Sequence, residues 1–312
     1  MRTPAPLPTG APARFLVSDA AERGISAKRL RAGDLEVPYR GVRIAGEIPV
    51  FFTEPYDGRR NELAVAAWKY APRLKPWQFY SHATSLALQG APRPEPASSV
   101  ELHVSAHRPR REPRIGGVIG HRLQVRELAW VTTPAGFRVE DAVRAWRQTG
   151  TLWALDDLIA AADFLVLPKN RLATIGELEA EVELMGDVTD GRLTRALREV
   201  RIGSESAGET RSRLLITRAG LPEPVLQYRL LDARGRFVAR LDAAYPEYGL
   251  AFEYDGRHHA DPSQFAKDAD RWEAIRQTGW RHIRLLDHHV RGPRPAAVRM
   301  VRDALRECGW PG

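Results

Sequence analysis

The chain has 312 residues, with 47 Lys and Arg against 39 Asp and Glu, a formal charge of +8 at pH 7 and a pI near 9.9. Its length predicts roughly two or three domains, and its 43% hydrophobic residues exclude an intrinsically disordered protein. The basic excess favours a polyanionic partner. The single cysteine, Cys308, excludes a framework of internal disulfides, as is typical of the cytoplasmic location that we expect.

The first 50 residues predict a basic DNA-binding unit. Residues 1–12 are a proline-rich arm that we expect to be disordered, and residues 13–50 indicate two short helices, capped by Ser18 and Ser26, before a strand hairpin over residues 35–44. This order resembles a winged helix, in which the second helix enters a DNA major groove and the wing contacts phosphates. The candidate DNA contacts are Lys28, Arg29, Arg31, Arg40 and Arg43. The alternative is a small packing unit with ordinary surface arginines.

Residues 51–167 predict an α/β platform. Its expected elements are a helix at 61–70, a strand-to-helix segment at 80–90, a strand at 100–104, a basic loop at 108–114, the segment 131–134 and helices over 139–164. His82 opens the helix of the second segment; it could serve as a catalytic base, although a lone histidine there is more often structural. Residues 13–164 resemble the antitoxin-type proteins of abortive-infection toxin–antitoxin systems, which implies DNA binding by the N-terminal region.

Residues 168–202 predict a helical connector, with helices over 175–185 and 190–200. The longest apolar candidate, residues 152–167, is interrupted by three aspartates, so we expect no membrane partner.

The C-terminal region, residues 203–312, predicts elements in the order α-β-β-β-α-β-α. The helices are expected over 206–218, 263–278 and 295–307, and the strands over 225–231, 237–245, 250–255 and 281–286. We therefore expect a multidomain α/β protein with a third, C-terminal α/β domain.

The second and third of these strands indicate a hairpin that brings two carboxylates together. A turn centred after Glu247 places Tyr245 opposite Leu250 on an apolar face and Asp242 opposite Glu253 on the other face. Directly opposed side chains lie about 5 Å apart at Cβ, where like charges repel. The pair therefore needs a cation, and a divalent metal ion is the expected one.

Asp255 falls on the same face and is predicted to lie opposite Arg240. In the alternative interpretation, this is a solvated sheet face on which Arg240 neutralises Asp255 and water screens the other carboxylates.

Residues 204–310 resemble the PD-(D/E)xK nuclease superfamily, in particular the domains similar to very-short-patch-repair endonucleases. The resemblance is carried by Glu209, Arg213, Leu241, Asp242, Phe252, Glu253, Asp255, Gly256, His259, Asp268, Asp270, Arg271, Gly279 and Trp280. It implies a restriction-endonuclease-like core in which Asp242 and Glu253 bind Mg²⁺ or Mn²⁺, with Glu209 as the first-helix glutamate that can join them.

The chain departs from the superfamily where Asp255 replaces its lysine. This change adds a candidate metal ligand and removes the usual water-activating group. His259 is the expected replacement, because an imidazole titrates near neutral pH and can accept a proton from water. Further candidates are Arg257, His258 and Lys267. The alternative for the histidines is an exposed loop.

Glu209 also has an alternative role. The spacing from Ser206 is that of a capping box, so Glu209 can stabilise the start of its helix and pair with Arg213 one turn later.

Two functions follow from these patterns. The first is a metal-dependent endonuclease that hydrolyses phosphodiester bonds in DNA during repair or defence, with a repair or toxin partner left open. The second is an antitoxin-like transcriptional regulator whose nuclease fold is inactive. The carboxylates Asp242, Glu253 and Asp255 favour activity, whereas the missing lysine favours its loss.

Overall fold

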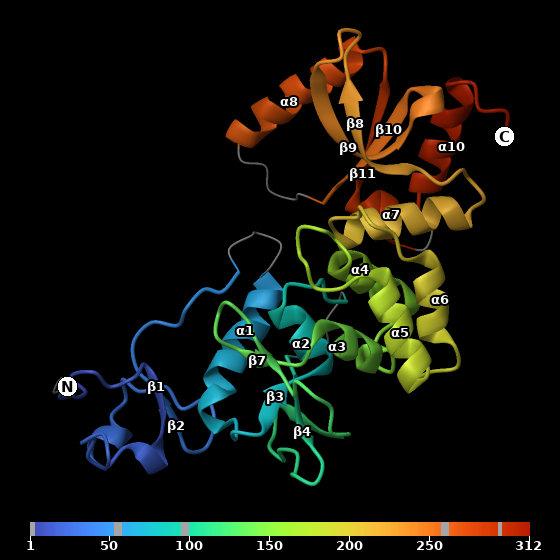
Figure 1. Cartoon of the computed structure of the whole chain (residues 1–312). Coiled ribbons are helices and arrows are strands. Elements are labelled where there is room, and N and C mark those ends of the chain that lie inside the picture. The colour runs from blue at the N-terminus through green and yellow to red at the C-terminus, as the bar shows by residue number, and fades with distance from the viewer. Residues whose placement is uncertain (1–3, 53–57, 95–99, 257–261, 293–294) are drawn as a thin grey trace. The chain divides into compact units, whose positions relative to one another are not determined.

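The computed structural model describes residues 4–52, 58–94, 100–256, 262–292 and 295–312. The chain divides into two compact units, Met1–Thr149 and Gly150–Gly312, and both mix helices with β-sheet (Figure 1). The sequence suggested a platform that reaches residue 167 and a separate connector over 168–202. In the structure, all residues from Gly150 onward belong to the second unit.

The N-terminal segment is built on a short strand pair. Strands β1 (Arg14–Leu16) and β2 (Val42–Ile44) are antiparallel, with Phe15 opposite Arg43. The two helices predicted here were wrong, because both segments form only 3-10 turns, η1 (Val17–Asp19) and η2 (Arg29–Arg31).

The helix-start signal at Ser26 produces one turn and no more. Its Oγ accepts the Arg29 N–H at 3.2 Å, as a helix cap would. The Arg29 guanidinium then binds both carboxylate oxygens of Asp34, at 2.8 and 2.6 Å, which folds the following residues back into a loop. A side-chain contact within the segment thus takes the place of a second helical turn.

The first unit contains a five-stranded sheet with the order β5-β4-β3-β7-β6. Its strands are β3 (Gln78–Tyr80), β4 (Leu102–His107), β5 (Val118–Leu123), β6 (Val131–Thr132) and β7 (Arg138–Val139), and its helices are α1 (Gly58–Tyr70), α2 (His82–Leu88) and α3 (Ala142–Thr149), with the 3-10 turn η4 (Ala71–Arg73) after α1. Leu63, Tyr80, Val104 and Phe137 meet in the core between α1 and the sheet. The predicted strand 100–104 is shifted, because β4 runs from Leu102 to His107.

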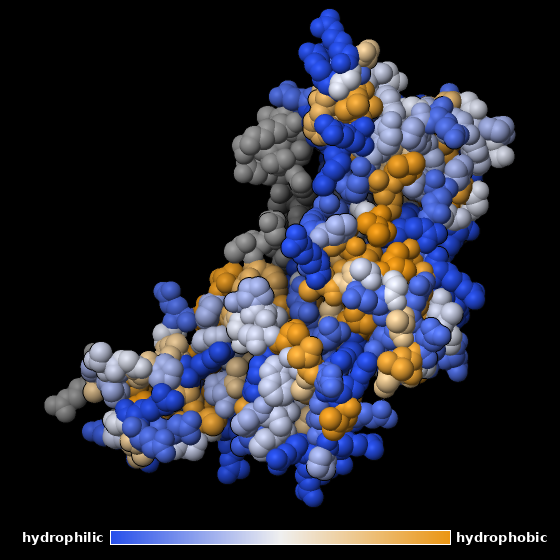
Figure 2. Space-filling model, in the orientation of Figure 1, coloured by the Kyte–Doolittle hydropathy of each residue, from blue (hydrophilic) through white to orange (hydrophobic). Residues whose placement is uncertain are grey.

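The second unit begins with three helices, α4 (Leu155–Leu165), α5 (Ile175–Met185) and α6 (Arg192–Glu199). Helix α5 spans the predicted residues because Thr174 and Glu177 form a capping box. The Thr174 Oγ1 accepts the Glu177 N–H at 3.2 Å, and the Glu177 carboxylate accepts the Thr174 N–H at 2.7 Å. Over the described residues, no helix is long and apolar enough to cross a membrane. On the face drawn in Figure 2, hydrophobic residues form patches on a largely hydrophilic surface.

The rest of the second unit follows the predicted order α-β-β-β-α-β-α, with one extra short helix. The elements are α7 (Ala207–Arg218), β8 (Val225–Leu231), β9 (Phe237–Tyr245), the 3-10 turn η5 (Pro246–Tyr248), β10 (Leu250–Asp255), α8 (Pro262–Gln277), β11 (Arg281–Leu286), α9 (Asp287–Val290) and α10 (Ala297–Glu307). The strands form one sheet with the order β11-β10-β9-β8, in which β10 and β11 are parallel and the other pairs antiparallel.

The hairpin register is confirmed where the ladder is formed. Leu250 lies opposite Tyr245 and Phe252 opposite Ala243, and these side chains pack with Val301 of α10 in one core. On the other face, Ala244 and Ala251 contact Ile275 of α8. Figure 1 shows α8 and α10 on opposite sides of the sheet. The face that carries Asp242 and Glu253 is therefore the one that α8 covers.

Helix α7 is joined to α4 by a buried ion pair. The Arg213 guanidinium donates to Asp163 Oδ2 at 2.8 Å, and these side chains are 2% and 0% exposed. The same carboxylate accepts the Thr210 hydroxyl at 2.8 Å and the Arg201 backbone N–H at 2.7 Å. The sequence suggested that Arg213 pairs with Glu209. In the structure, Arg213 pairs with Asp163 instead.

Gly208 allows α7 to lie directly against strand β10. A Cβ at this position would meet the Tyr254 ring at 1.9 Å, far inside van der Waals contact. We expect Gly208→Ala to lower the free energy of unfolding by about 1–3 kcal/mol, because the ring or helix must shift. Gly176→Ala in α5 is the matched control, since its Cβ would meet nothing within 4 Å; it should stabilise by about 0.5–1 kcal/mol. Urea denaturation of both variants checks this, and equal effects would refute the close packing.

Candidate active site

Asp242 of β9 and Glu253 of β10 lie on neighbouring strands, one position beyond the last paired residues of the hairpin. The Tyr254 backbone N–H lies close to the Asp242 carboxylate and acts to lower its pKa, although burial and neighbouring charges outweigh it. Glu253 is 7% exposed. The predicted approach of these two acids is confirmed, and it places two carboxylates in a poorly solvated setting.

The surroundings of the two acids move their pKa values apart. Burial, together with the charges of Glu209 and Glu253, raises the pKa of Asp242 to about 8. Burial also acts to raise the pKa of Glu253, but hydrogen bonds from His282 and Arg271 outweigh it and lower that pKa to about 2. At neutral pH, Glu253 is therefore ionised while Asp242 retains its proton, an arrangement that often marks acid–base sites.

The cation next to Glu253 is an arginine. Arg271 of α8 donates hydrogen bonds to both carboxylate oxygens of Glu253, from Nη1 to Oε2 at 2.8 Å and from Nη2 to Oε1. Its Nη2 also donates to the Arg240 carbonyl oxygen at 2.8 Å. His282 of β11 approaches Oε2 through Nε2 at 2.8 Å. Both oxygens of Glu253 are thus held, which explains its low pKa.

The predicted partnership of Arg240 with Asp255 was wrong. Arg240 instead pairs with Glu205 at 3.1 Å, and Asp255 binds Arg284 of β11. The reason is the parallel neighbour, since β11 lines up beside β10 and supplies a nearer cation than β9 does. The Arg284 guanidinium is further fixed over the Trp272 ring, 3.8 Å from its centroid.

Glu209 fulfils the helix-start part of its alternative role, without the pair to Arg213, and still lies near the acids. Its backbone N–H donates to Ser206 Oγ at 3.1 Å, and its carboxylate accepts the Glu205 N–H at 2.8 Å, which stabilises the start of α7. Burial raises the pKa of Glu209, and its charge is among those that raise the pKa of Asp242. The helix start therefore contributes a third carboxylate to the neighbourhood.

The histidine proposed as proton acceptor, His259, lies outside the described residues, as do Arg257 and His258. Lys267 falls within α8, but its side chain also lies outside the description. Among the described residues, no three His, Cys, Asp or Glu side chains are grouped to hold a metal ion. The carboxylate pair alone still suits Mg²⁺, which proteins often bind by one or two acids while phosphate oxygens and water complete the shell.

Sequence reasoning gave no site role to Arg271 or His282. His282 could have been found by alternation, since paired strands place His282 beside Ala251 and on the same face as Glu253. Finding it required knowing that β11 is the parallel partner of β10. Arg271 approaches from a helix that crosses the sheet, so no strand periodicity indicates it.

His82 does not stand alone, contrary to the expectation from sequence. Its ring stacks on His121 of β5 with centroids 3.8 Å apart, and His103 Nδ1 lies 2.9 Å from His121 Nε2. Burial lowers the pKa of His82 to about 2 and that of His103 to about 4. These imidazoles are neutral at pH 7 and poorly suited to a base that works near neutrality, which favours the structural alternative.

A buried glutamate beside this histidine cluster titrates in the opposite sense. Burial raises the pKa of Glu140 to about 8, and its Oε1 accepts the Gln148 side-chain N–H at 2.7 Å. In the range from about pH 4.5 to 8, the folded state holds the Glu140 proton more tightly than the unfolded state. Stability from Glu140 is therefore lost as the pH rises through this range.

Unfolding at several pH values can separate these effects. Folding lowers the pKa of His103 from 6.5 to about 4. The stability that the neutral ring contributes is therefore lost as the pH falls through this range, by up to about 1.4 kcal/mol per pH unit. We expect His103→Gln to reduce this acid sensitivity, to which His82 also contributes, and Glu140→Gln to reduce the loss of stability between pH 6.5 and 8, to which Asp242 also contributes. The same pH dependence in both variants as in the parent would contradict the buried titrations.

The predicted DNA-contacting residues fall into two groups. Arg29 binds Asp34, and Arg43 donates to the Leu30 carbonyl at 2.8 Å, so both hold the N-terminal segment together. Lys28, Arg31 and Arg40 are exposed and remain candidates for DNA contacts.

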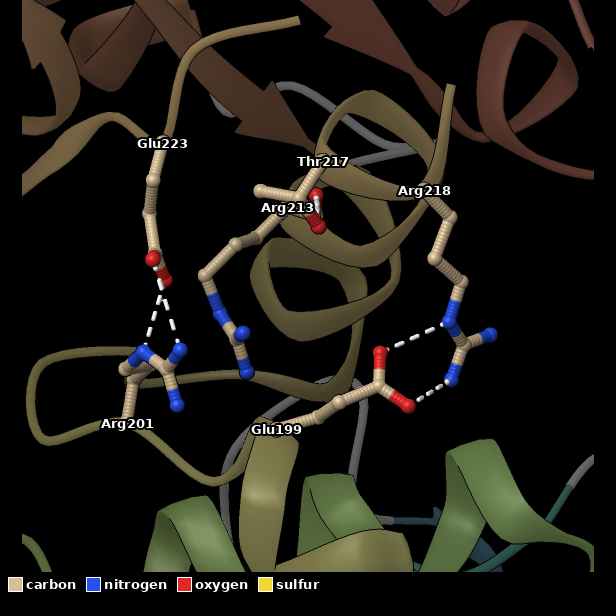
Figure 3. Close-up of a pocket in the computed structure, with 6 residues that line it drawn as sticks. All are labelled: Glu199, Arg201, Arg213, Thr217, Arg218 and Glu223. Atoms are coloured by element: carbon tan, nitrogen blue, oxygen red, sulfur yellow. Dashed lines mark hydrogen bonds and ion pairs between the residues drawn. The ribbon is translucent and has the colours of Figure 1, made fainter. Parts of the chain in front are cut away.

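A pocket of about 240 Å³ in the second unit has a different character. It is lined by Glu199, Arg201, Arg213, Thr217, Arg218 and Glu223 (Figure 3). Each of its arginines has a carboxylate partner, since Arg201 binds Glu223 at 2.6 Å, Arg218 binds Glu199 at 2.8 Å and Arg213 binds Asp163. We assign this pocket to an ion-pair network that connects α6 and α7.

Comparison with known proteins gives relatives without an activity in their names. No protein-family model matches the chain, and no solved structure matches it. Two curated proteins are similar, the uncharacterized proteins MT2308 of Mycobacterium tuberculosis strain CDC 1551 / Oshkosh and Rv2248 of strain ATCC 25618 / H37Rv. Each is 29% identical over 234 residues, which cover 72% of this chain and 82% of the relative. An alignment of this length is longer than either compact unit, so the similarity includes residues of both.

Proposed function

We propose that this chain binds DNA and hydrolyses its phosphodiester bonds with a divalent metal ion in the second unit. The observation that carries the proposal is the pair Asp242 and Glu253, held on neighbouring strands of one sheet with their pKa values driven apart. The α-β-β-β-α-β-α order, which the resemblance to PD-(D/E)xK nucleases implies, gives further support. The net charge of +8 suits a polyanionic substrate.

The residues present fit a divalent cation through Asp242 and Glu253. Burial, then the charges of Glu209 and Glu253, raise the pKa of Asp242, and a cation bound to these carboxylates would oppose their mutual repulsion. Carboxylate oxygens are the ligands that Mg²⁺ and Mn²⁺ accept. When bound, such an ion would neutralise charge on the phosphoryl oxygens and lower the pKa of the attacking water.

The chain's own groups prepare this site. Asp242 holds a proton on its carboxyl group at neutral pH and must release it before it can act as a ligand. His282 fixes the orientation of Glu253 through its bond to Oε2. Arg284 holds Asp255 against β11, so Asp255 is engaged in an ion pair where the superfamily has its lysine.

DNA binding by the first unit can be tested separately. We expect the triple variant Lys28→Ala, Arg31→Ala, Arg40→Ala to bind duplex DNA more weakly and to flatten the salt dependence of its affinity, by up to roughly one unit of slope for each phosphate that is no longer neutralised. The matched control exchanges the same positions for the other basic residue, as in Lys28→Arg, and should keep the parental slope. If the alanine variant keeps its affinity and slope across a salt titration, these side chains are ordinary surface charge.

A second function is favoured by one observation. Both oxygens of Glu253 are occupied by Arg271 and His282, as they would be in a nuclease fold that has lost its metal. Such a protein would bind DNA as an antitoxin-like regulator without cutting it.

Thermal unfolding with added Mn²⁺ distinguishes the two functions. A ligand that binds only the folded state stabilises it, by about 2.7 kcal/mol at a concentration 100 times its dissociation constant. The nuclease proposal expects a melting temperature that rises with Mn²⁺ in the parent and much less in Glu253→Gln. The same response in both proteins, or none in either, favours the regulator.

A further inference from the structure

Arg271 occupies the position at which the proposed metal ion would have to bind Glu253. Its two terminal nitrogens match the two carboxylate oxygens, a paired geometry that is among the stronger charge-assisted contacts in proteins. A metal ion that takes either oxygen must break at least one of these bonds. Arg271 and the metal ion are therefore competitors for the same acid.

The same guanidinium serves the second acid of the site. Its bond to the Arg240 carbonyl at 2.8 Å lays it across the junction of β9 and β10, and its charge acts on Asp242 as well as on Glu253. One arginine thus provides the charge that a divalent ion would provide to the pair. Its release would leave Asp242 and Glu253 without their common counter-charge.

Arg271 is placed so that it can leave. Its side chain is 34% exposed, whereas that of Glu253 is 10% exposed, so the guanidinium can enter water while the carboxylate stays in its protected position. His282, whose side chain is 9% exposed, stays with Glu253 from strand β11 and maintains its orientation. Of the two side chains that bind Glu253, Arg271 is therefore the one that is better exposed to water.

We propose that Arg271 is a built-in counter-ion that closes the acid site and is displaced from Glu253 when a divalent metal ion binds. This inference rests on the proposed function. A metal ion can bind only those molecules in which Arg271 has left Glu253. The apparent metal affinity is therefore the intrinsic affinity multiplied by the fraction of metal-free molecules in that state. Arg271 therefore sets the metal concentration at which the site fills.

Titration calorimetry with Mn²⁺ on the full chain tests the inference without any substrate. We expect Arg271→Ala to bind Mn²⁺ at least about tenfold more tightly than the parent, because the competitor is gone. Arg271→Lys keeps the positive charge but loses the second terminal nitrogen that binds Glu253. Its Mn²⁺ affinity should lie between those of the parent and Arg271→Ala, and it serves as the test if the alanine variant does not fold. Arg276→Ala is the matched control, since Arg276 lies on the same helix, is exposed and pairs with Glu273 instead; it should bind like the parent.

The outcomes separate this inference from the proposed function. If the parent binds Mn²⁺ and cuts DNA while Arg271→Ala and Arg271→Lys bind with parental affinity, the counter-ion role is refuted and the nuclease stands. If neither the parent nor either Arg271 variant binds Mn²⁺, both are refuted. A variant with weaker binding than the parent would show that Arg271 supports the metal site and does not compete for it.

Discussion

Replacing Asp242 with asparagine is expected to reduce DNA cleavage by about 10²–10⁴-fold, because in the proposed nuclease the variant lacks one of the two carboxylates that would hold the metal ion, and with it several kcal/mol of transition-state stabilisation. The same change should stabilise the metal-free protein at alkaline pH. The folded state raises the pKa of Asp242 to about 8, so its contribution to stability falls as the pH rises from about 4 to 8, by up to about 1.4 kcal/mol per pH unit. Asparagine resembles the protonated acid and avoids this loss.

Urea unfolding at pH 6 and pH 9 measures the second effect, and gel-based cleavage of duplex DNA measures the first. Glu253→Gln is the informative comparison, since it should also stop cleavage but should weaken the fold by leaving Arg271 and His282 without their carboxylate. Opposite stability changes in two inactive variants would be hard to obtain from a general structural defect. If Asp242→Asn cuts as fast as the parent, Asp242 has no role in catalysis.

Replacing Asp163 with alanine is expected to lower the free energy of unfolding of the second unit by about 3–5 kcal/mol. The reason is that Arg213, 2% exposed, would retain its charge in a buried position without a carboxylate. The Thr210 hydroxyl and the Arg201 backbone N–H would lose an acceptor as well. Because this change lies between α4 and α7, DNA cleavage under strongly stabilising conditions should persist.

The midpoint of urea denaturation, at unchanged slope, reports this loss. Asp156→Ala is the matched control on the same helix, since Asp156 is exposed and its partner Arg218 also pairs with Glu199. We expect the control to cost less than about 1 kcal/mol. Similar costs for both aspartates would contradict the special position of the buried pair.

The sequence predicted best those features that depend on neighbours along the chain. The hairpin register followed from alternating apolar residues and one turn, and it placed Tyr245 opposite Leu250 as observed. Helix α5 began at its capping box, which is a signal of four consecutive residues. In both cases, residues close in sequence determine the structure, so the pattern can be recognised without knowing the fold.

The partners of the acids could not be predicted in this way. Glu253 is paired with Arg271 and His282, which reach it from a covering helix and from a parallel strand 29 residues further along. The histidine cluster likewise joins α2 with two strands, so His82 looked isolated in the sequence. The second N-terminal helix was predicted wrongly although its contacts are local. Ser26 caps a first turn, but the Arg29 side chain then binds Asp34 and the segment does not continue as a helix.

The most direct measurement of the central claim is cleavage of a labelled DNA duplex by the purified chain, with and without Mg²⁺ or Mn²⁺, alongside mismatched and single-stranded DNA. We expect cleavage of at least one substrate that requires the metal ion, is stopped by a chelator and is lost in both Asp242→Asn and Glu253→Gln. Binding of DNA without cleavage of any of these substrates, by the parent at metal concentrations that saturate its own site, would contradict the proposed nuclease function.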